Sequence, residues 1–164
     1  MLKFFLGIAI VGLTSFIGYL LAKKYRQKKA FFMQLYEFNE RFLSELSYRR
    51  RPIRELVASY AYQGEFKELL DDFFLSLDKK SSKDLAVFDL PEYTFLTKEE
   101  KGLVADYFLM FGRGDSLSQK GYFSSLKDTL SSQAEKAADT CKRYGDLYMK
   151  IGFLCGLLIL ILII

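Results

Sequence analysis

Few side chains in this sequence have the types and spacing that catalysis or metal binding requires. The 164 residues include no histidine, which excludes Ser-His-Asp and Cys-His nucleophile arrangements and histidine-based zinc sites. No glycine-rich phosphate loop with its lysine is present, so the sequence has no nucleotide-hydrolysing motif. Two adjacent acidic pairs, Asp71–Asp72 and Glu99–Glu100, are expected on helices, where neighbouring side chains point apart. We therefore predict no catalytic, cofactor-binding or metal-binding residues, and a protein that is not an enzyme.

The basic side chains near the start of the chain indicate a membrane boundary. Residues 4–22 are uncharged, and as a helix they would span about 28 Å, close to the hydrocarbon thickness of a bilayer. A cleaved signal peptide is the alternative. A cluster without acidic residues follows at once and is expected to resist translocation and stay in the cytoplasm. It consists of Lys23, Lys24, Arg26, Lys28 and Lys29. We predict a transmembrane helix over residues 1–22.

A second uncharged run covers residues 151–164, which would span only about 21 Å as a helix. Residues 147–149 lengthen it by a turn, and Lys150 can snorkel to the headgroups. A buried core helix is the alternative, but the run has no polar face. We predict a transmembrane helix over residues 148–164 that continues the preceding helix. Lys142, Arg143 and Lys150 then place its beginning in the cytoplasm, with both termini outside.

Small residues at four-residue spacing occur in both predicted spans, and such positions favour close helix pairing in lipid. The first span has Thr14 and Gly18, and the second has Gly152 and Gly156.

The residues between the spans, 23–147, predict an all-α cytoplasmic bundle of about six helices. Apolar side chains recur there at helical spacing, Pro52 suits a first helical turn, and Thr97 with Glu100 forms a capping box. The first expected helix runs to about Tyr48. Helices over Pro52–Tyr62, closed by Gly64, and over Glu65–Leu77 follow, and then a short helix and loop in Ser81–Leu96. A further helix begins at Thr97 and is ended by Gly112 and Gly114, and a long helix begins at Asp115 or Ser116, uses Gln119 to complete a second capping box and runs unbroken into the last span.

Charge divides the bundle unevenly. Residues 23–54 contain ten basic and three acidic side chains, whereas residues 65–106 contain six basic and eleven acidic ones. The basic part can face anionic lipid headgroups and its own acidic neighbour. A second interpretation makes Arg49, Arg50, Arg51 and Arg54 a docking patch for an acidic partner. Nucleic acid is disfavoured, because the patch is short and lacks a recognised motif.

The order of these features resembles the stage III sporulation protein AB family of endospore-forming bacteria, over essentially the whole chain. The resemblance is carried by the opening residues Met1, Leu2 and Lys3 before the first span and by signature positions along the rest of the chain. Arg49–Arg51 depart from the small or glycine-containing turn that is usual before the proline, and Phe111-Gly112 replaces the usual Leu-Gly. The signature positions are Glu45, Tyr48, Pro52, Ile53, Glu55, Gly112, Asp115, Gln119, Gly152 and Gly156.

This resemblance implies a compact bundle similar to the cytoplasmic domains of platform proteins in type II secretion and type IV pilus machines. It implies a non-enzymatic part of the mother cell–forespore channel, or feeding-tube apparatus, in the outer forespore membrane. The implied partners are the ATPase, stage III sporulation protein AA, the membrane proteins AC, AD and AE, the ring proteins AF, AG and AH, and stage II sporulation protein Q across the intermembrane space. A homo-oligomer is a further possible assembly.

Three alternatives remain beside this interpretation. The protein can be a platform-like component of a secretion or pilus system, or a membrane anchor for a cytoplasmic regulatory enzyme. An enzyme active on lipids is a distant third, because the sequence has no histidine and no nucleophile motif.

Overall fold

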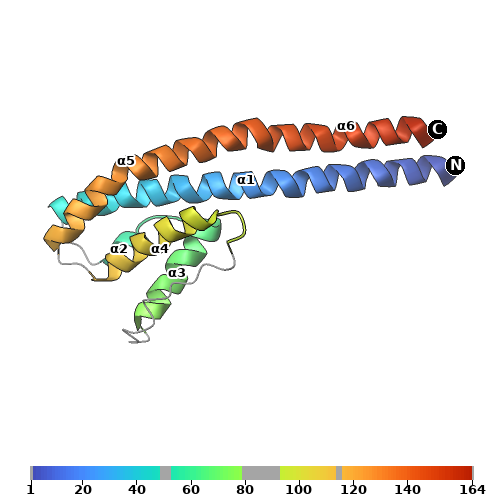
Figure 1. Cartoon of the computed structure of the whole chain (residues 1–164). Helices are drawn as coiled ribbons and strands as arrows, with labels where there is room; N and C mark the ends of the chain where they lie inside the picture. The colour runs from blue at the N-terminus through green and yellow to red at the C-terminus, as the bar shows by residue number, and fades with distance from the viewer. Residues whose placement is uncertain (1, 49–52, 79–92, 114–115, 164) are drawn as a thin grey trace. The chain divides into compact units, whose positions relative to one another are not determined.

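The computed structural model describes residues 2–48, 53–78, 93–113 and 116–163, and over these residues the protein is helical with short turns. The predicted all-α fold is confirmed. The elements are α1 (Leu2–Tyr48), α2 (Ile53–Ala58), α3 (Gly64–Asp78), α4 (Lys98–Arg113), α5 (Ser116–Thr140), a π-helical segment (Cys141–Gly145) and α6 (Asp146–Ile163) (Figure 1). They form two compact units, one of residues Met1–Lys29 with Glu135–Ile164 and one of Ala30–Ala134.

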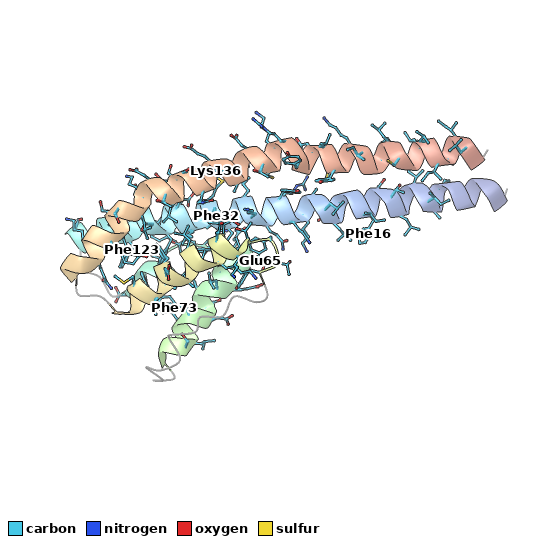
Figure 2. The ribbon with its side chains drawn as sticks, viewed as in Figure 1. Phe16, Phe32, Glu65, Phe73, Phe123 and Lys136 are labelled. Atoms are coloured by element: carbon cyan, nitrogen blue, oxygen red, sulfur yellow. The ribbon has the colours of Figure 1, made fainter. Side chains whose placement is uncertain are left out.

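The second unit is a helical bundle around an aromatic core. The part of α1 after Lys29 buries a stripe of side chains that recur three or four residues apart, as the helical period requires. The rings pack closely, with centroids 4.7 Å apart for Phe42 and Phe111 and 5.1 Å for Phe73 and Phe108. Figure 2 shows three members of this core on different helices, Phe32 on α1, Phe73 on α3 and Phe123 on α5. The fully buried large side chains are Phe31, Phe32, Leu35, Phe38, Phe42, Phe66, Leu69, Leu70, Phe73, Tyr107, Phe108 and Phe123.

One polar side chain, Asn39, lies completely buried in this aromatic core. Its Nδ2 donates a hydrogen bond to the carbonyl oxygen of Phe123 at 3.2 Å, and its Oδ1 accepts one from the Tyr107 hydroxyl at 3.4 Å. These bonds satisfy polar groups that would be costly to bury alone. They also fix α1 relative to α4 and α5. Burial raises the pKa of Tyr107 well above its usual value.

Local sequence signals predicted several helix ends correctly. Helix α3 begins within one residue of the predicted start and covers all of the predicted Glu65–Leu77, and α1 is helical throughout its described residues up to Tyr48. The capping box before α4 is present with both of its hydrogen bonds. The Thr97 amide donates to Glu100 Oε2 at 2.9 Å, and the Glu100 amide donates to Thr97 Oγ1 at 3.3 Å. Such reciprocal bonds satisfy two amide groups that have no partner within the helix.

The second helix is shorter than predicted, because α2 ends at Ala58 rather than at Tyr62. After it the chain makes tight turns, with the Tyr60 amide bonded to the Val57 carbonyl and the Tyr62 amide to the Tyr60 carbonyl. Gly64 does not close α2 but begins α3, with a φ of +60°. This left-handed conformation favours glycine. Of the stretch 81–96, only residues 93–96 are described, and they form a turn and a bend.

The long final helix is not a regular α-helix, because the π-helical segment Cys141–Gly145 separates α5 from α6. Gln119 also differs from its predicted capping role. Its Nε2 donates to the Phe111 carbonyl oxygen at 3.2 Å, so it satisfies the C-terminal end of α4.

Candidate membrane-anchoring and docking sites

Two described helical stretches are long and apolar enough to cross a membrane, by length and composition. They fall within Gly7–Ser47 and Gln119–Leu162, and each overlaps one of the predicted spans. Apolar side chains project outward from both, and Phe16, which is 57% exposed, points away from α6 in Figure 2. Helices that are apolar all around are typical of a lipid environment.

The two spans pack against each other as an antiparallel pair (Figure 1), with glycines at the contact. A Cβ atom on Gly18 would lie 2.6 Å from the Tyr148 carbonyl oxygen, and one on Gly152 would lie 2.8 Å from the Thr14 carbonyl oxygen. A Cβ on Gly156 would lie 2.9 Å from Val11 Cα. Because these neighbours are backbone atoms, no side-chain rotation can relieve the overlap. The glycines therefore set the separation of the helices, as expected for packing in lipid.

The π-helical segment keeps small residues on one face of this helix pair. Ala137, Gly145, Gly152 and Gly156 are all buried. Eight residues of a regular α-helix turn through two turns plus about 80°, so Ala137 and Gly145 would point in different directions. The wider π turn rotates the chain less per residue and returns Gly145 to the buried face.

Three tyrosines stack where the glycine contacts end. The Tyr25 ring lies 5.8 Å from the rings of both Tyr144 and Tyr148, with interplanar angles of 24° and 14°. Next to them, Arg26 Nη2 donates to Met149 Sδ at 3.2 Å. Tyrosine and basic side chains are enriched at membrane–water interfaces. Of the predicted interface residues, Lys23, Lys24, Arg26 and Lys150 are exposed, and Lys28 and Lys29 are half-buried.

The predicted docking patch falls mostly outside the described residues. Arg49, Arg50, Arg51, Pro52 and Asp115 all lie outside them. Arg54 and Ile53 lie in α2, Tyr48 is the last residue of α1, and Gly112 lies in α4. Glu55 is exposed in the first turn of α2. Glu45 is half-buried, and its Oε2 has no hydrogen-bond donor among the described residues.

A surface cavity between α2 and α3 was not predicted from the sequence. It has a volume of about 430 Å³ and is lined by side chains that include Val57, Tyr60, Ala61, Lys67, Asp71 and Phe74. We call it the α2–α3 groove. Tyr60 and Tyr62 follow α2 two residues apart, but no local signal in the sequence indicated that a groove forms there.

Two contacts from α1 hold the wall of this groove. The Gln34 side chain pairs with the backbone of Gln63, accepting from its amide at 2.8 Å and donating to its carbonyl at 3.0 Å. The Arg41 guanidinium lies 3.8 Å above the centre of the Tyr60 ring, a cation–π contact. The segment between α2 and α3 is therefore fixed on the bundle.

Two ion pairs of the described bundle lie at its surface. Lys127 Nζ lies 2.8 Å from Glu40 Oε2, and this hydrogen bond raises the pKa of Lys127. Arg41 also pairs with Glu37 at 3.3 Å. Within the described ranges, no three His, Cys, Asp or Glu residues are grouped to hold a metal ion. The arrangement is suited to anchoring and binding.

These features define a class of small helical protein, with a compact aromatic bundle and two paired helices that are long and apolar enough to cross a membrane. The chain belongs to the stage III sporulation protein AB family, whose model matches residues 3–164. The match covers essentially the whole chain and confirms the family resemblance. The protein is thus a stage III sporulation protein. No curated protein and no solved structure matches the chain significantly.

Proposed function

We propose that the protein is a non-enzymatic platform component of the channel between mother cell and forespore. The two spans anchor it in the outer forespore membrane, with the bundle in the mother-cell cytoplasm. There the bundle docks the ATPase, stage III sporulation protein AA, and links it to the membrane subunits. Membership of the AB family supports the assignment to sporulation.

The observation that carries the proposed topology is that the basic flanks of both spans lie at the same end of the helix pair. Tyr25, within the cluster Lys23–Lys29, stacks on Tyr144 and Tyr148, which lie between Lys142 and Lys150. Basic flanks favour the cytoplasmic side. Two antiparallel spans with basic flanks at one end therefore favour the orientation in which that end faces the cytoplasm.

The topology is tested by adding protease to intact protoplasts. We expect residues 23–147 to be protected until the membrane is permeabilised, and the protein to stay in the membrane fraction after carbonate washing. Digestion of the bundle in intact protoplasts, or release by carbonate, would contradict the proposed anchoring.

The platform role is tested in a sporulating host. Deletion of the gene is expected to arrest development after engulfment, with failure of late forespore gene expression. The full-length protein, purified in mild detergent, is expected to recover the AA ATPase. Reversing the charges of Arg49, Arg50, Arg51 and Arg54 should weaken that recovery if this patch is the contact, and unchanged recovery at moderate salt would exclude the patch. Normal spores from the deletion strain would refute the platform role.

A further inference from the structure

The outer face of α3, beside the α2–α3 groove, combines an exposed apolar side chain with acidic neighbours. Leu75 is 58% exposed. Residues three, four and seven positions before it lie on the same helix face, and these are Asp72, Asp71 and Glu68, all of them exposed. Asp71 also lines the groove. The cavity, the exposed leucine and the carboxylates therefore form one continuous surface, which we call the α3 surface.

The groove side of the α3 surface is preorganised. The Arg41 guanidinium packs on the ring of Tyr60, which lines the groove, and the Gln34 side chain bonds the backbone of Gln63. This side of the groove is therefore already ordered before a partner binds. Preorganised surfaces of this kind bind with a smaller entropic cost.

The charge of α3 selects among the possible partners. Helix α3 contains five acidic residues and one basic residue. Exposed carboxylates repel anionic lipid headgroups and acidic proteins, and they attract lysine and arginine side chains. The cavity beside them has room for one large apolar side chain.

We infer that the α3 surface docks a basic amphipathic segment of a cytoplasmic partner protein. One apolar side chain of that segment fills the α2–α3 groove, and its basic side chains pair with Glu68, Asp71 and Asp72. The inference rests on the proposed function, because it names the surface at which the bundle receives its cytoplasmic partner, first of all the AA ATPase.

The test uses the full-length protein in mild detergent and measures how much AA ATPase it recovers. Three changes alter the α3 surface: Leu75→Glu, the double change Asp71→Lys with Asp72→Lys, and Ala61→Trp, which fills the cavity from its rim. We expect each to reduce recovery at least tenfold, as for central interface positions. Recovery by the unchanged protein should also fall as salt is raised.

Two control variants carry the same kinds of change elsewhere on the bundle. Met33→Glu places a charge at an apolar position of α1 that is 42% exposed, and Asp128→Lys reverses an exposed charge on α5. Neither lies on the α3 surface, so recovery should be unchanged. Unfolding followed by circular dichroism checks that all variants remain folded, which is expected because every altered side chain is exposed.

Failure of the inference can be told apart from failure of the proposed function. If the unchanged protein recovers the ATPase and the α3-surface variants recover it equally well, the inference is refuted and the proposed function stands. If the unchanged protein recovers no ATPase, the docking role fails, and a photo-crosslinking residue at position 75 in sporulating cells tests the surface separately. A crosslink mapped to a basic segment of another channel subunit, and lost in the Asp71→Lys, Asp72→Lys background, would support the inference. A crosslink to a second copy of this chain, or none, would overturn it.

Discussion

The close contact between the two spans can be tested by adding a single methyl group to one of its glycines. Replacing Gly152 by alanine places a Cβ 2.8 Å from the Thr14 carbonyl oxygen and 3.1 Å from Gly18 Cα. Non-bonded heavy atoms prefer separations of about 3.5 Å or more. Since both neighbours are backbone, the helices must separate locally by about 0.7 Å, the difference between the preferred distance and the first of these contacts.

That separation sets the expected cost. A gap of this size forfeits about a quarter to a half of the dispersion energy of the contacts that it opens, and overpacking of this kind costs about 1–3 kcal/mol. Alanine regains up to about 1 kcal/mol through its higher helix propensity. We therefore expect Gly152→Ala to destabilise the helix pair by about 1–2 kcal/mol, and Gly152→Leu to cost more.

The first span contains a matched control. A Cβ on Gly12 would meet nothing within 4 Å, so Gly12→Ala makes the same chemical change without an overlap. It should leave the stability of the pair unchanged or raise it by up to about 1 kcal/mol. Only Gly152→Ala is therefore expected to destabilise the helix pair.

The assay exploits the absence of tryptophan from the chain. In a Tyr144→Trp background the single indole lies beside Tyr25, at the end of the helix pair. Its fluorescence reports separation of the helices as SDS is titrated into the full-length protein in mild detergent. If Gly152→Ala shifts the midpoint upward as far as Gly12→Ala does, the close backbone contact is not what holds the helices together.

Three further predictions concern the bundle and are measured by urea unfolding of the full-length protein in mild detergent. Gly121→Ala should stabilise it by about 1 kcal/mol, because this exposed position of α5 has nothing within 4 Å of an added Cβ; destabilisation would contradict the packing described. Thr97→Ala and Glu100→Ala should each cost about 1 kcal/mol, and the double change less than the sum, because both residues belong to one capping box; full additivity would argue against a shared box. Stability should fall as pH rises above about 10, because burial keeps the folded pKa of Tyr107 above that of the unfolded chain; a Tyr107→Phe variant should show a smaller fall, and an equal fall would exclude this residue as a cause.

The sequence predicted those elements whose signals are local. The starts of α3 and α4 depend on apolar spacing and on side chains within three or four residues of each other. Such signals need no knowledge of distant contacts. The glycine spacing of the two spans is also local, and the structure places Gly18, Gly152 and Gly156 at backbone contacts.

The α2–α3 groove was missed because distant residues create it. The pairing of Gln34 with Gln63 joins positions 29 residues apart, and Arg41 reaches Tyr60 from α1. These contacts hold the segment after Ala58 on the bundle, whereas local propensity alone predicted a helix to Tyr62. Tertiary contacts of this kind commonly override propensity.

The π-helical segment was missed for a different reason. The last helix was predicted to run unbroken into the membrane span, but the structure exposes Tyr144 and buries Gly145. A stripe of apolar residues is too broad to distinguish these neighbours by period alone. The informative signal was the spacing of small side chains, since Ala137, Cys141 and Gly145 follow each other in steps of four, more than one regular turn.

The two parts of α1 pack by different means, and the difference favours a membrane boundary between them independently of charge. Before Lys23, its closest helix contacts run through glycine, with a Cβ excluded at Gly18. After Lys29, its contacts run through fully buried phenylalanines. In water, burying large apolar surface drives association, whereas in lipid that drive is absent and close backbone approach takes its place. A helix that changes from small to aromatic contacts within one basic stretch is therefore expected to leave the bilayer there, and the positive charges of that stretch favour the same boundary.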